Sequence, residues 1–121
     1  MISLEATKST PRIHYDESTK TLEIMGELYP ENSFAFFDPV FSWLTETLPG
    51  LDAFTLKLGI RYMNSSSTKC ILDILDMMSD AFDKGCKIKA LWLYEKGNER
   101  ALDLAEEFKE DFSFPFDVCP V

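Results

Sequence analysis

The segment with the clearest chemical potential is a run of four hydroxyl residues, Ser65 to Thr68, directly after Asn64. It lies between an alternating apolar segment and an amphipathic one, where a strand is expected to lead into a helix. Serine, threonine and asparagine are preferred helix caps, but one cap accounts for only one of these residues. An exposed hydroxyl beside the free N–H groups of a helix is also a place where a phosphate would be stabilised. The run therefore fits helix capping, and it also fits a phosphorylation switch.

Other catalytic or ligand-binding patterns are sparse. The only histidine, His14, has no cysteine near it in sequence, and no glycine-rich phosphate loop is present. Nothing places His14 beside a serine nucleophile. Cys70 could be a redox-sensitive thiol near a helix start, although a small core residue is the simpler interpretation. One helical face carries acidic residues that fit a solvated surface better than a metal site: Asp73, Asp76, Asp80 and Asp83. We therefore expect no enzymatic activity, no cofactor and no metal.

The composition narrows the classes of partner. The chain has 121 residues, with 12 Lys and Arg against 21 Asp and Glu, which gives a formal charge of −9. Such acidity disfavours binding to nucleic acid or to anionic membrane surfaces. The sequence shows no signal peptide and no apolar run of membrane-spanning length, and Cys70, Cys86 and Cys119 form no CxxC pair. We expect reduced thiols, a cytoplasmic location and no membrane insertion.

The apolar pattern predicts a single α/β domain over residues 1–121. Alternation indicates a β-hairpin around 13–24 and two further strands at 54–61 and 87–94. Helical spacing predicts helices at 34–48, at 67–84 and from Asn98 onward. Pro39 is expected to kink the first helix or to divide it. The buried stripe of that helix is expected to comprise Phe34, Phe37, Phe41, Leu44 and Leu48.

The expected order of elements is β-β-α-β-α-β-α, with an edge piece at 114–116. Strand 54–61, helix 67–84 and strand 87–94 would form a right-handed βαβ unit. We expect a mixed sheet of four or five strands with helices mainly on one face. In this arrangement residues 64–68 form a polar loop after a central strand.

Several short motifs, in order along the chain, resemble the SiaC family of bacterial regulatory phosphoproteins. The most specific are the Tyr-Pro-Glu-Asn segment at 29–32 and the Asn followed by hydroxyl residues at 64–67. The remaining motifs are at 9–11, 62–63, 92–94, 105–108 and 113–116, together with Lys69. The resemblance covers nearly the whole chain. The family is similar to the anti-sigma-factor antagonists, so the resemblance implies a STAS-like domain, in agreement with the α/β pattern.

The resemblance also implies a function. In this family a dedicated Ser/Thr protein kinase phosphorylates the domain, and a PP2C-type phosphatase reverses the modification. The unphosphorylated form binds and activates a diguanylate cyclase, which raises cyclic di-GMP and promotes biofilm growth. The matching acceptor in this chain is Ser65, where the family usually has threonine. Ser66, Ser67 and Thr68 are the alternative acceptors.

The partner surface is expected around the same loop. The candidates from the loop and its flanks are Arg61, Asn64, Ser66, Ser67 and Lys69, and those from the preceding motif are Tyr29, Glu31 and Asn32. Two other functions remain open. One is an anti-sigma-factor antagonist that applies the same switch to a transcriptional partner. The other is a small ligand-binding domain whose pocket uses residues 29–33.

Overall fold

The chain forms a six-stranded sheet with three helices in a computed structural model that describes residues 2–121. The strands are β1 (Ser3–Leu4), β2 (Arg12–Asp16), β3 (Thr21–Leu28), β4 (Ala53–Met63), β5 (Lys87–Tyr94) and β6 (Phe116–Pro120). The helices are α1 (Ser33–Thr47), α2 (Ser65–Asp83) and α3 (Glu99–Glu110), and a short 3₁₀ turn, η1 (Leu48–Gly50), follows α1. The predicted α/β class and the mixed sheet are confirmed.

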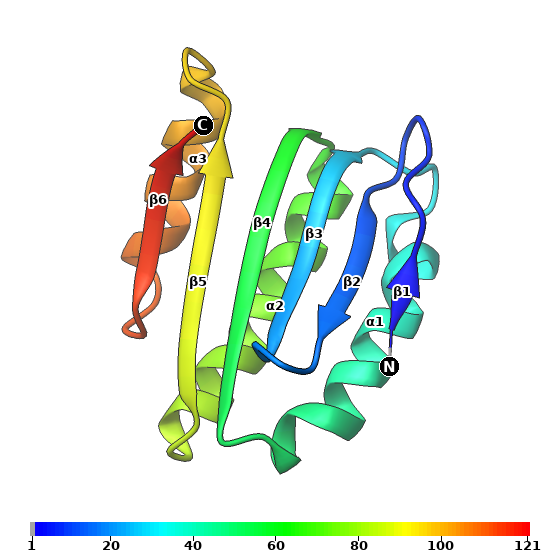
Figure 1. Ribbon diagram of the computed structural model, residues 1–121. Helices are drawn as coiled ribbons and strands as arrows, with labels where there is room; N and C mark the ends of the chain where they lie inside the picture. The colour runs from blue at the N-terminus through cyan, green and yellow to red at the C-terminus, as the bar shows by residue number, and fades with distance from the viewer. Residues whose placement is uncertain (1) are drawn as a thin grey trace.

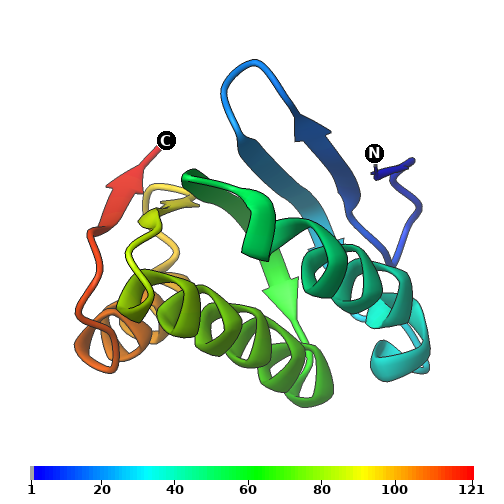
Figure 2. The same ribbon diagram turned by 90° about the horizontal axis from the view of Figure 1, so that it is seen from below.

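The strands lie side by side in the same order as in the sequence, from β1 to β6. The pairs β1–β2 and β2–β3 are antiparallel, and β3 to β6 are parallel to one another. Each helix therefore connects two adjacent parallel strands and moves the chain one step in the same direction. Right-handed crossovers of this kind bring successive helices to the same face, and Figures 1 and 2 show all three helices there.

The sheet has more strands than the four or five predicted. β1 is too short to show alternation in the sequence, because only Ser3 and Leu4 pair with β2. At the other edge β6 pairs with β5 from Phe116 to Pro120. The edge piece predicted at 114–116 thus ends at the first residue of a parallel strand, β6.

Helix α1 buries part of the predicted stripe: Phe37 and Leu44 are buried as expected, and Leu48 is buried in η1. Its buried residues are Ser33, Phe37, Val40 and Leu44, and Phe34 is 55% exposed. The predicted burial of Phe34 was wrong because the buried face of α1 begins one residue earlier, at Ser33, and this turns Phe34 toward solvent. Pro39 lies on the exposed side of one continuous helix and does not divide it.

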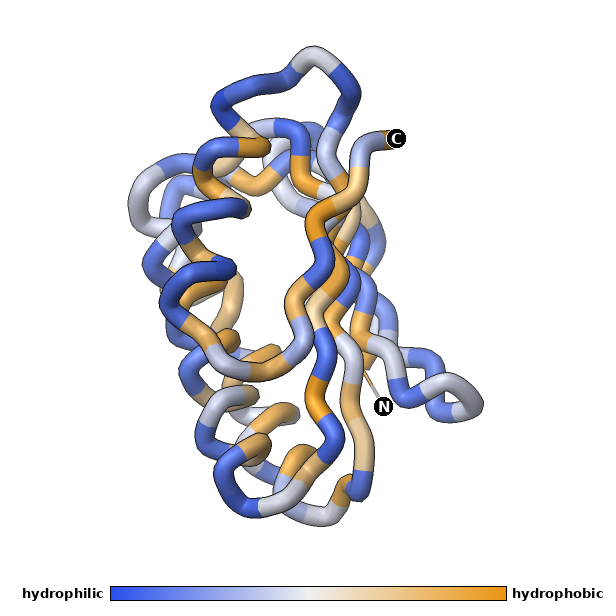
Figure 3. Tube along the Cα trace, turned by 90° about the vertical axis from the view of Figure 1, so that its left-hand side faces the viewer, coloured by the Kyte–Doolittle hydropathy of each residue, from blue (hydrophilic) through white to orange (hydrophobic). Residues whose placement is uncertain are grey.

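The core lies between the sheet and the helices. In β4 the side chains of Phe54, Leu56, Leu58 and Ile60 are buried, and the residues between them point to the other face. Figure 3 shows the same alternation of apolar and polar positions along the strands. No helix of the described chain covers that other face. Its neighbouring strands are joined there by ion pairs, Arg12–Glu23 at 3.2 Å and Lys89–Asp117 at 3.4 Å.

Helix α2 begins at Ser65, two residues earlier than predicted. The expected polar loop at 64–68 is therefore the first turn of a helix, and Asn64 alone separates it from β4. This correction follows from the cap. Asn64 has an extended backbone and its side chain accepts a hydrogen bond from the N–H of Ser67, so helical geometry starts at the next residue.

Candidate functional site

Asn64 fixes the junction between β4 and α2. Its side-chain Oδ1 accepts from the N–H of Ser67 at 3.0 Å, and its Nδ2 donates to the carbonyl of Pro30 at 3.3 Å. Its own N–H donates to the carbonyl of Leu28 at 3.2 Å. One residue thus caps α2 and ties it to the end of β3 and to the segment before α1. The start of α2 is therefore held in a fixed position at the C-terminal end of β4.

Three hydroxyls of the Ser65–Thr68 run are engaged in holding this junction. Ser33, at the start of α1, lies with its Oγ 2.8 Å from the Oγ of Ser66 and 2.8 Å from the Oγ of Ser67. Ser33 and Ser67 are almost fully buried, with 1% and 0% of their surface exposed. Thr68 donates through Oγ1 to the carbonyl of Asn64 at 3.1 Å. The hydroxyls therefore join the first turns of α1 and α2.

Ser65 differs from its neighbours. It is exposed, and its hydroxyl makes no hydrogen bond to any other residue of the described chain. It is the first residue of α2, where the free backbone N–H groups and the helix dipole favour negative charge. Of the four candidate acceptors, Ser65 is the one whose hydroxyl is exposed and not engaged in the junction.

Exposed aromatic side chains come from the segments that meet at this junction. Tyr29, Phe34 and Tyr62, which we call the aromatic patch, are 40%, 55% and 53% exposed. Tyr29 and Tyr62 contact each other edge to face, with ring centroids 5.4 Å apart. Phe34 follows Ser33, which bonds to the first turn of α2. Exposed aromatic residues of this kind are typical of protein–protein contact surfaces.

Sequence reasoning missed two members of the aromatic patch, Phe34 and Tyr62. Phe34 has the right spacing for the core stripe and differs from Ser33 by one position only. Tyr62 had a usable signal, because the buried alternation of β4 ends at Ile60 and the next two residues are both exposed. An aromatic residue just beyond a buried strand, and directly before the hydroxyl run, could have been assigned to the surface.

The other predicted partner-binding residues lie around this junction in different roles. Asn32 caps α1 by accepting from the N–H of Ala35 at 3.0 Å, and Glu31 beside it is exposed. Two predicted cations are already paired. Arg61 lies 3.2 Å from Glu27. Lys69 donates to Asp73 at 2.9 Å, and this hydrogen bond raises the pKa of Lys69.

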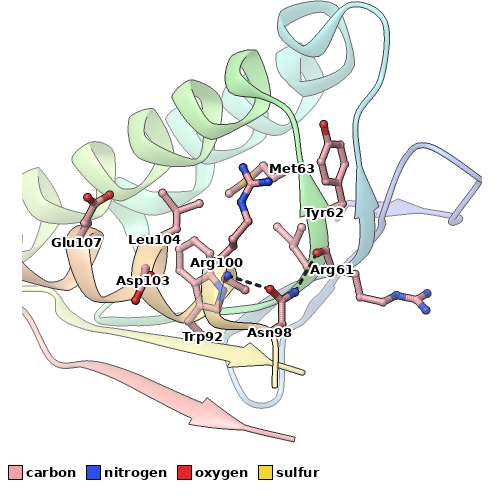
Figure 4. A pocket seen from close by; sticks show the side chains of 11 residues that line it. Arg61, Tyr62, Met63, Trp92, Asn98, Arg100, Asp103, Leu104 and Glu107 are labelled. Atoms are coloured by element: carbon pink, nitrogen blue, oxygen red, sulfur yellow. Dashed lines mark hydrogen bonds between the residues drawn. The ribbon is translucent and has the colours of Figure 1, made fainter. Parts of the chain in front are cut away.

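A cavity of about 540 Å³ opens beside the junction, between the end of β4 and the first half of α3 (Figure 4). Its walls include Tyr62 and Met63 from β4, Trp92 from β5, and Arg100 and Leu104 from α3. The start of α3 is tied to β4, since Asn98 Nδ2 donates to the carbonyl of Arg61 at 3.4 Å. The end of β4 therefore lines the cavity and also leads, through Asn64, to Ser65.

Residues 2–121 offer little other equipment for chemistry. They hold no group of three or more His, Cys, Asp or Glu side chains placed to bind a metal ion. Within the same range, no helix has both the length and the apolar character needed to cross a membrane. The acidic face of α2 contains Asp76, whose pKa is raised by burial and then by Asp73 and Asp80.

Cys70 is fully buried, and burial raises the pKa of its thiol, which is opposite to the change that a redox-sensitive cysteine needs. We expect Cys70 to react with Ellman's reagent at least about tenfold more slowly than the half-buried Cys119 in the native protein. All three thiols should react at similar rates in denaturant. Rapid reaction of Cys70 in the native state, identified by peptide mapping, would contradict this assignment.

Comparison with known proteins agrees with the geometry. The family model for SiaC family regulatory phosphoproteins matches residues 4–121. An uncharacterised protein of Pseudomonas aeruginosa strain UCBPP-PA14 is 40% identical over 118 residues, which are 97% of this chain and 94% of that protein. These matches confirm the resemblance drawn from the sequence motifs.

Solved structures give the same result. A chain in the crystal structure of the diguanylate cyclase SiaD in complex with its activator SiaC, from Pseudomonas aeruginosa, is 38% identical and superposes with a TM-score of 0.94 over 100% of both chains. A structure of SiaC of Pseudomonas aeruginosa is 36% identical, with a TM-score of 0.91 over 99% of this chain and 98% of that one. On the sequence match and the shared fold together, this chain belongs to the SiaC family of regulatory phosphoproteins.

Proposed function

We propose that this chain is a non-enzymatic regulatory protein whose unphosphorylated form binds and activates a diguanylate cyclase in the cytoplasm, and so raises cyclic di-GMP. Phosphorylation of Ser65 ends the activation. The likeness to the SiaC–SiaD complex supports the choice of partner, because it extends over the whole chain at 38% identity. The aromatic patch supplies an apolar surface on which a partner could dock.

The observation that carries the proposal is the contrast between Ser65 and its neighbours. Ser66 and Ser67 hold the junction of α1 and α2 together through Ser33, whereas Ser65 is exposed and has no hydrogen bond within the described chain. A kinase could therefore modify Ser65 without breaking the junction. The phosphate would bring about −1.5 to −2 charges beside the aromatic patch, where a partner must displace water.

The proposed modification requires two further partners, a Ser/Thr protein kinase and a PP2C-type phosphatase. In the kinase reaction Ser65 Oγ bonds to the γ-phosphorus of ATP, the bond from that phosphorus to the β-phosphate bridging oxygen breaks, and ADP leaves. The hydroxyl proton passes to a base of the kinase. In the phosphatase reaction water attacks the phosphorus, Ser65 regains its proton and inorganic phosphate is released.

The proposal is tested by adding the purified, unmodified chain to the diguanylate cyclase from the same genome and measuring cyclic di-GMP formed from GTP. We expect the rate to rise at least about tenfold at saturation. An unchanged rate would refute the proposed activation.

Incubation with the kinase and ATP, followed by mass spectrometry, should place the phosphate on Ser65. A phosphate outside 65–68 would refute the proposed switch, and capture of an anti-sigma factor instead of the cyclase would favour the alternative function.

The aromatic patch gives a second expected result. Phe34→Ala and Tyr62→Ala should each lower the affinity for the cyclase at least about tenfold, which is about 1.4 kcal/mol, because exposed aromatic side chains are frequent binding hot spots. The free energy of unfolding should change by no more than about 0.5 kcal/mol. Val121→Ala is the matched control, because Val121 is the remaining exposed large apolar residue among residues 2–121, at 71%. Isothermal titration calorimetry compares the three variants, and equal affinities would exclude the patch from the interface.

A further inference from the structure

We propose that Arg100 binds the phosphate once Ser65 is phosphorylated, so that the modified protein holds its own phosphoserine in an ion pair between α3 and α2. This inference rests on the proposed function in one respect, the choice of Ser65 as the acceptor. It adds a phosphate-binding residue and a new ion pair between α3 and the start of α2.

Arg100 lies on the cavity wall near the end of β4. Arg100 is the second residue of α3 and lines the cavity together with Tyr62 and Met63, the last two residues of β4. In Figure 4 its side chain extends from α3 toward Met63, while Arg61 points away from the cavity. Met63 is two residues before Ser65. The guanidinium therefore faces the segment that leads directly into the acceptor.

Helix α3 is anchored at its start to β4. Asn98, two residues before Arg100, donates to the carbonyl of Arg61 at 3.4 Å and also caps α3 by accepting from the N–H of Ala101 at 3.2 Å. The first turn of α3 is thus held against the end of β4. The backbone of Arg100 is therefore anchored near the C-terminal end of β4, the strand that leads into Ser65.

Arg100 differs from the neighbouring cations in having no carboxylate partner. Of the cations near the junction, Arg61 is paired with Glu27 and Lys69 with Asp73. Arg100 is exposed and has no carboxylate within 4.0 Å in the described chain, although Asp103 lies one turn further along the same helix. Its guanidinium is free to take a new anion without breaking an existing ion pair.

The chemistry of the pair favours this assignment. A guanidinium presents a planar set of donors that matches two phosphate oxygens, and such charge-assisted pairs are stronger than neutral hydrogen bonds. Asp103 and Glu107 also line the cavity and would oppose an anion that entered it freely. A phosphate on Ser65 does not have to enter the cavity from solvent, because it is held covalently at the start of α2, two residues after the cavity-lining Met63. The resulting bridge would cover the cavity mouth next to the aromatic patch.

The test uses the full chain with phosphoserine installed at position 65 by codon reassignment, so that neither kinase nor cyclase is needed. A ³¹P NMR titration measures the second pKa of the phosphate, which is ordinarily about 6. A nearby guanidinium favours the dianion and lowers this pKa, so Arg100→Gln should raise it by about 0.5 units or more. Arg100→Lys should give an intermediate value. The matched control is Lys96→Gln, which removes a charge just before α3 from a residue outside the cavity lining.

Failure of the ion pair and failure of the proposed function give different results. A phosphoserine pKa that is the same in the Arg100→Gln variant as in the chain that keeps Arg100 would overturn the ion pair, as would an equal rise in the Lys96→Gln control. In both cases regulation of the cyclase by phosphorylation would still stand. Conversely, a cyclase that is not activated would refute the proposed function and leave the measured ion pair in place. Thermal unfolding of the unmodified variants checks that the exposed Arg100 position tolerates the exchange.

Discussion

A chain that carries phosphoserine at position 65 is expected to bind the diguanylate cyclase about 100-fold more weakly than the unmodified chain, a loss of about 2.7 kcal/mol. The phosphate would lie beside the aromatic patch, where binding requires water to be displaced from a surface that then contains a dianion. Isothermal titration calorimetry with the phosphoserine protein measures the loss directly. Ser65→Ala should bind within about threefold of the unmodified chain, because it removes only an unbonded hydroxyl.

The control for this prediction is phosphoserine at Ser18, an exposed residue in the turn between β2 and β3 at the opposite end of the sheet (Figure 1). Both phosphoproteins have the same net charge. The modification at Ser18 should therefore leave cyclase affinity nearly unchanged if location decides the effect. Equal losses from the two sites would mean that the overall acidity of the chain, and not the α2 junction, controls binding.

Asn64→Ala is expected to lower the free energy of unfolding by about 2–3 kcal/mol. The substitution removes the cap of α2, which is worth about 1 kcal/mol, and the hydrogen bond to the carbonyl of Pro30. It also takes away the oxygen beside Ser33 and Ser67, which are buried and then have fewer partners. Urea denaturation measures the change as a lower midpoint at an unchanged slope.

Asn98→Ala is the matched control for this prediction. Asn98 caps α3 in the same way, but the residues around it are exposed, so its loss should cost about 1 kcal/mol. Asn64→Asp should recover part of the loss, because a carboxylate oxygen can cap α2 but cannot donate to Pro30. If the Asn64→Ala and Asn98→Ala variants were equally stable, the hydrogen bonds of Asn64 to Ser33 and Pro30 would contribute nothing beyond an ordinary helix cap.

The sequence predicted the parts of the fold that repeat with a local period. The alternation from Phe54 to Ile60 located β4, and the spacing of Ile71, Ile74 and Met78 located α2. β1 was missed because two paired residues have no period. The start of the buried α1 face was misjudged because Ser33 and Phe34 are adjacent, and only the tertiary hydrogen bonds of Ser33 decide between them.

The candidate site was predicted in part. The hydroxyl run and Asn64 were visible from residue types alone, and the family resemblance gave Ser65 as the acceptor. The pattern could not show which hydroxyls are engaged, because their partner Ser33 lies more than 30 residues away along the chain. The proposed role of Arg100 was not visible for the same reason, since its relation to Ser65 depends on how the start of α3 packs beside the end of β4.

The match between strand order and sequence order has a consequence for how the molecule is built. Each strand from β2 onward pairs with the strand that precedes it in the chain, so a nascent protein can extend the sheet at one edge as each unit emerges. The proposed acceptor at the start of α2 takes its place before α3 and β6 are synthesised. The hydrogen bonds between Ser33 and the first turn of α2 thus form within the earlier part of the chain. Arg100 follows later, with α3.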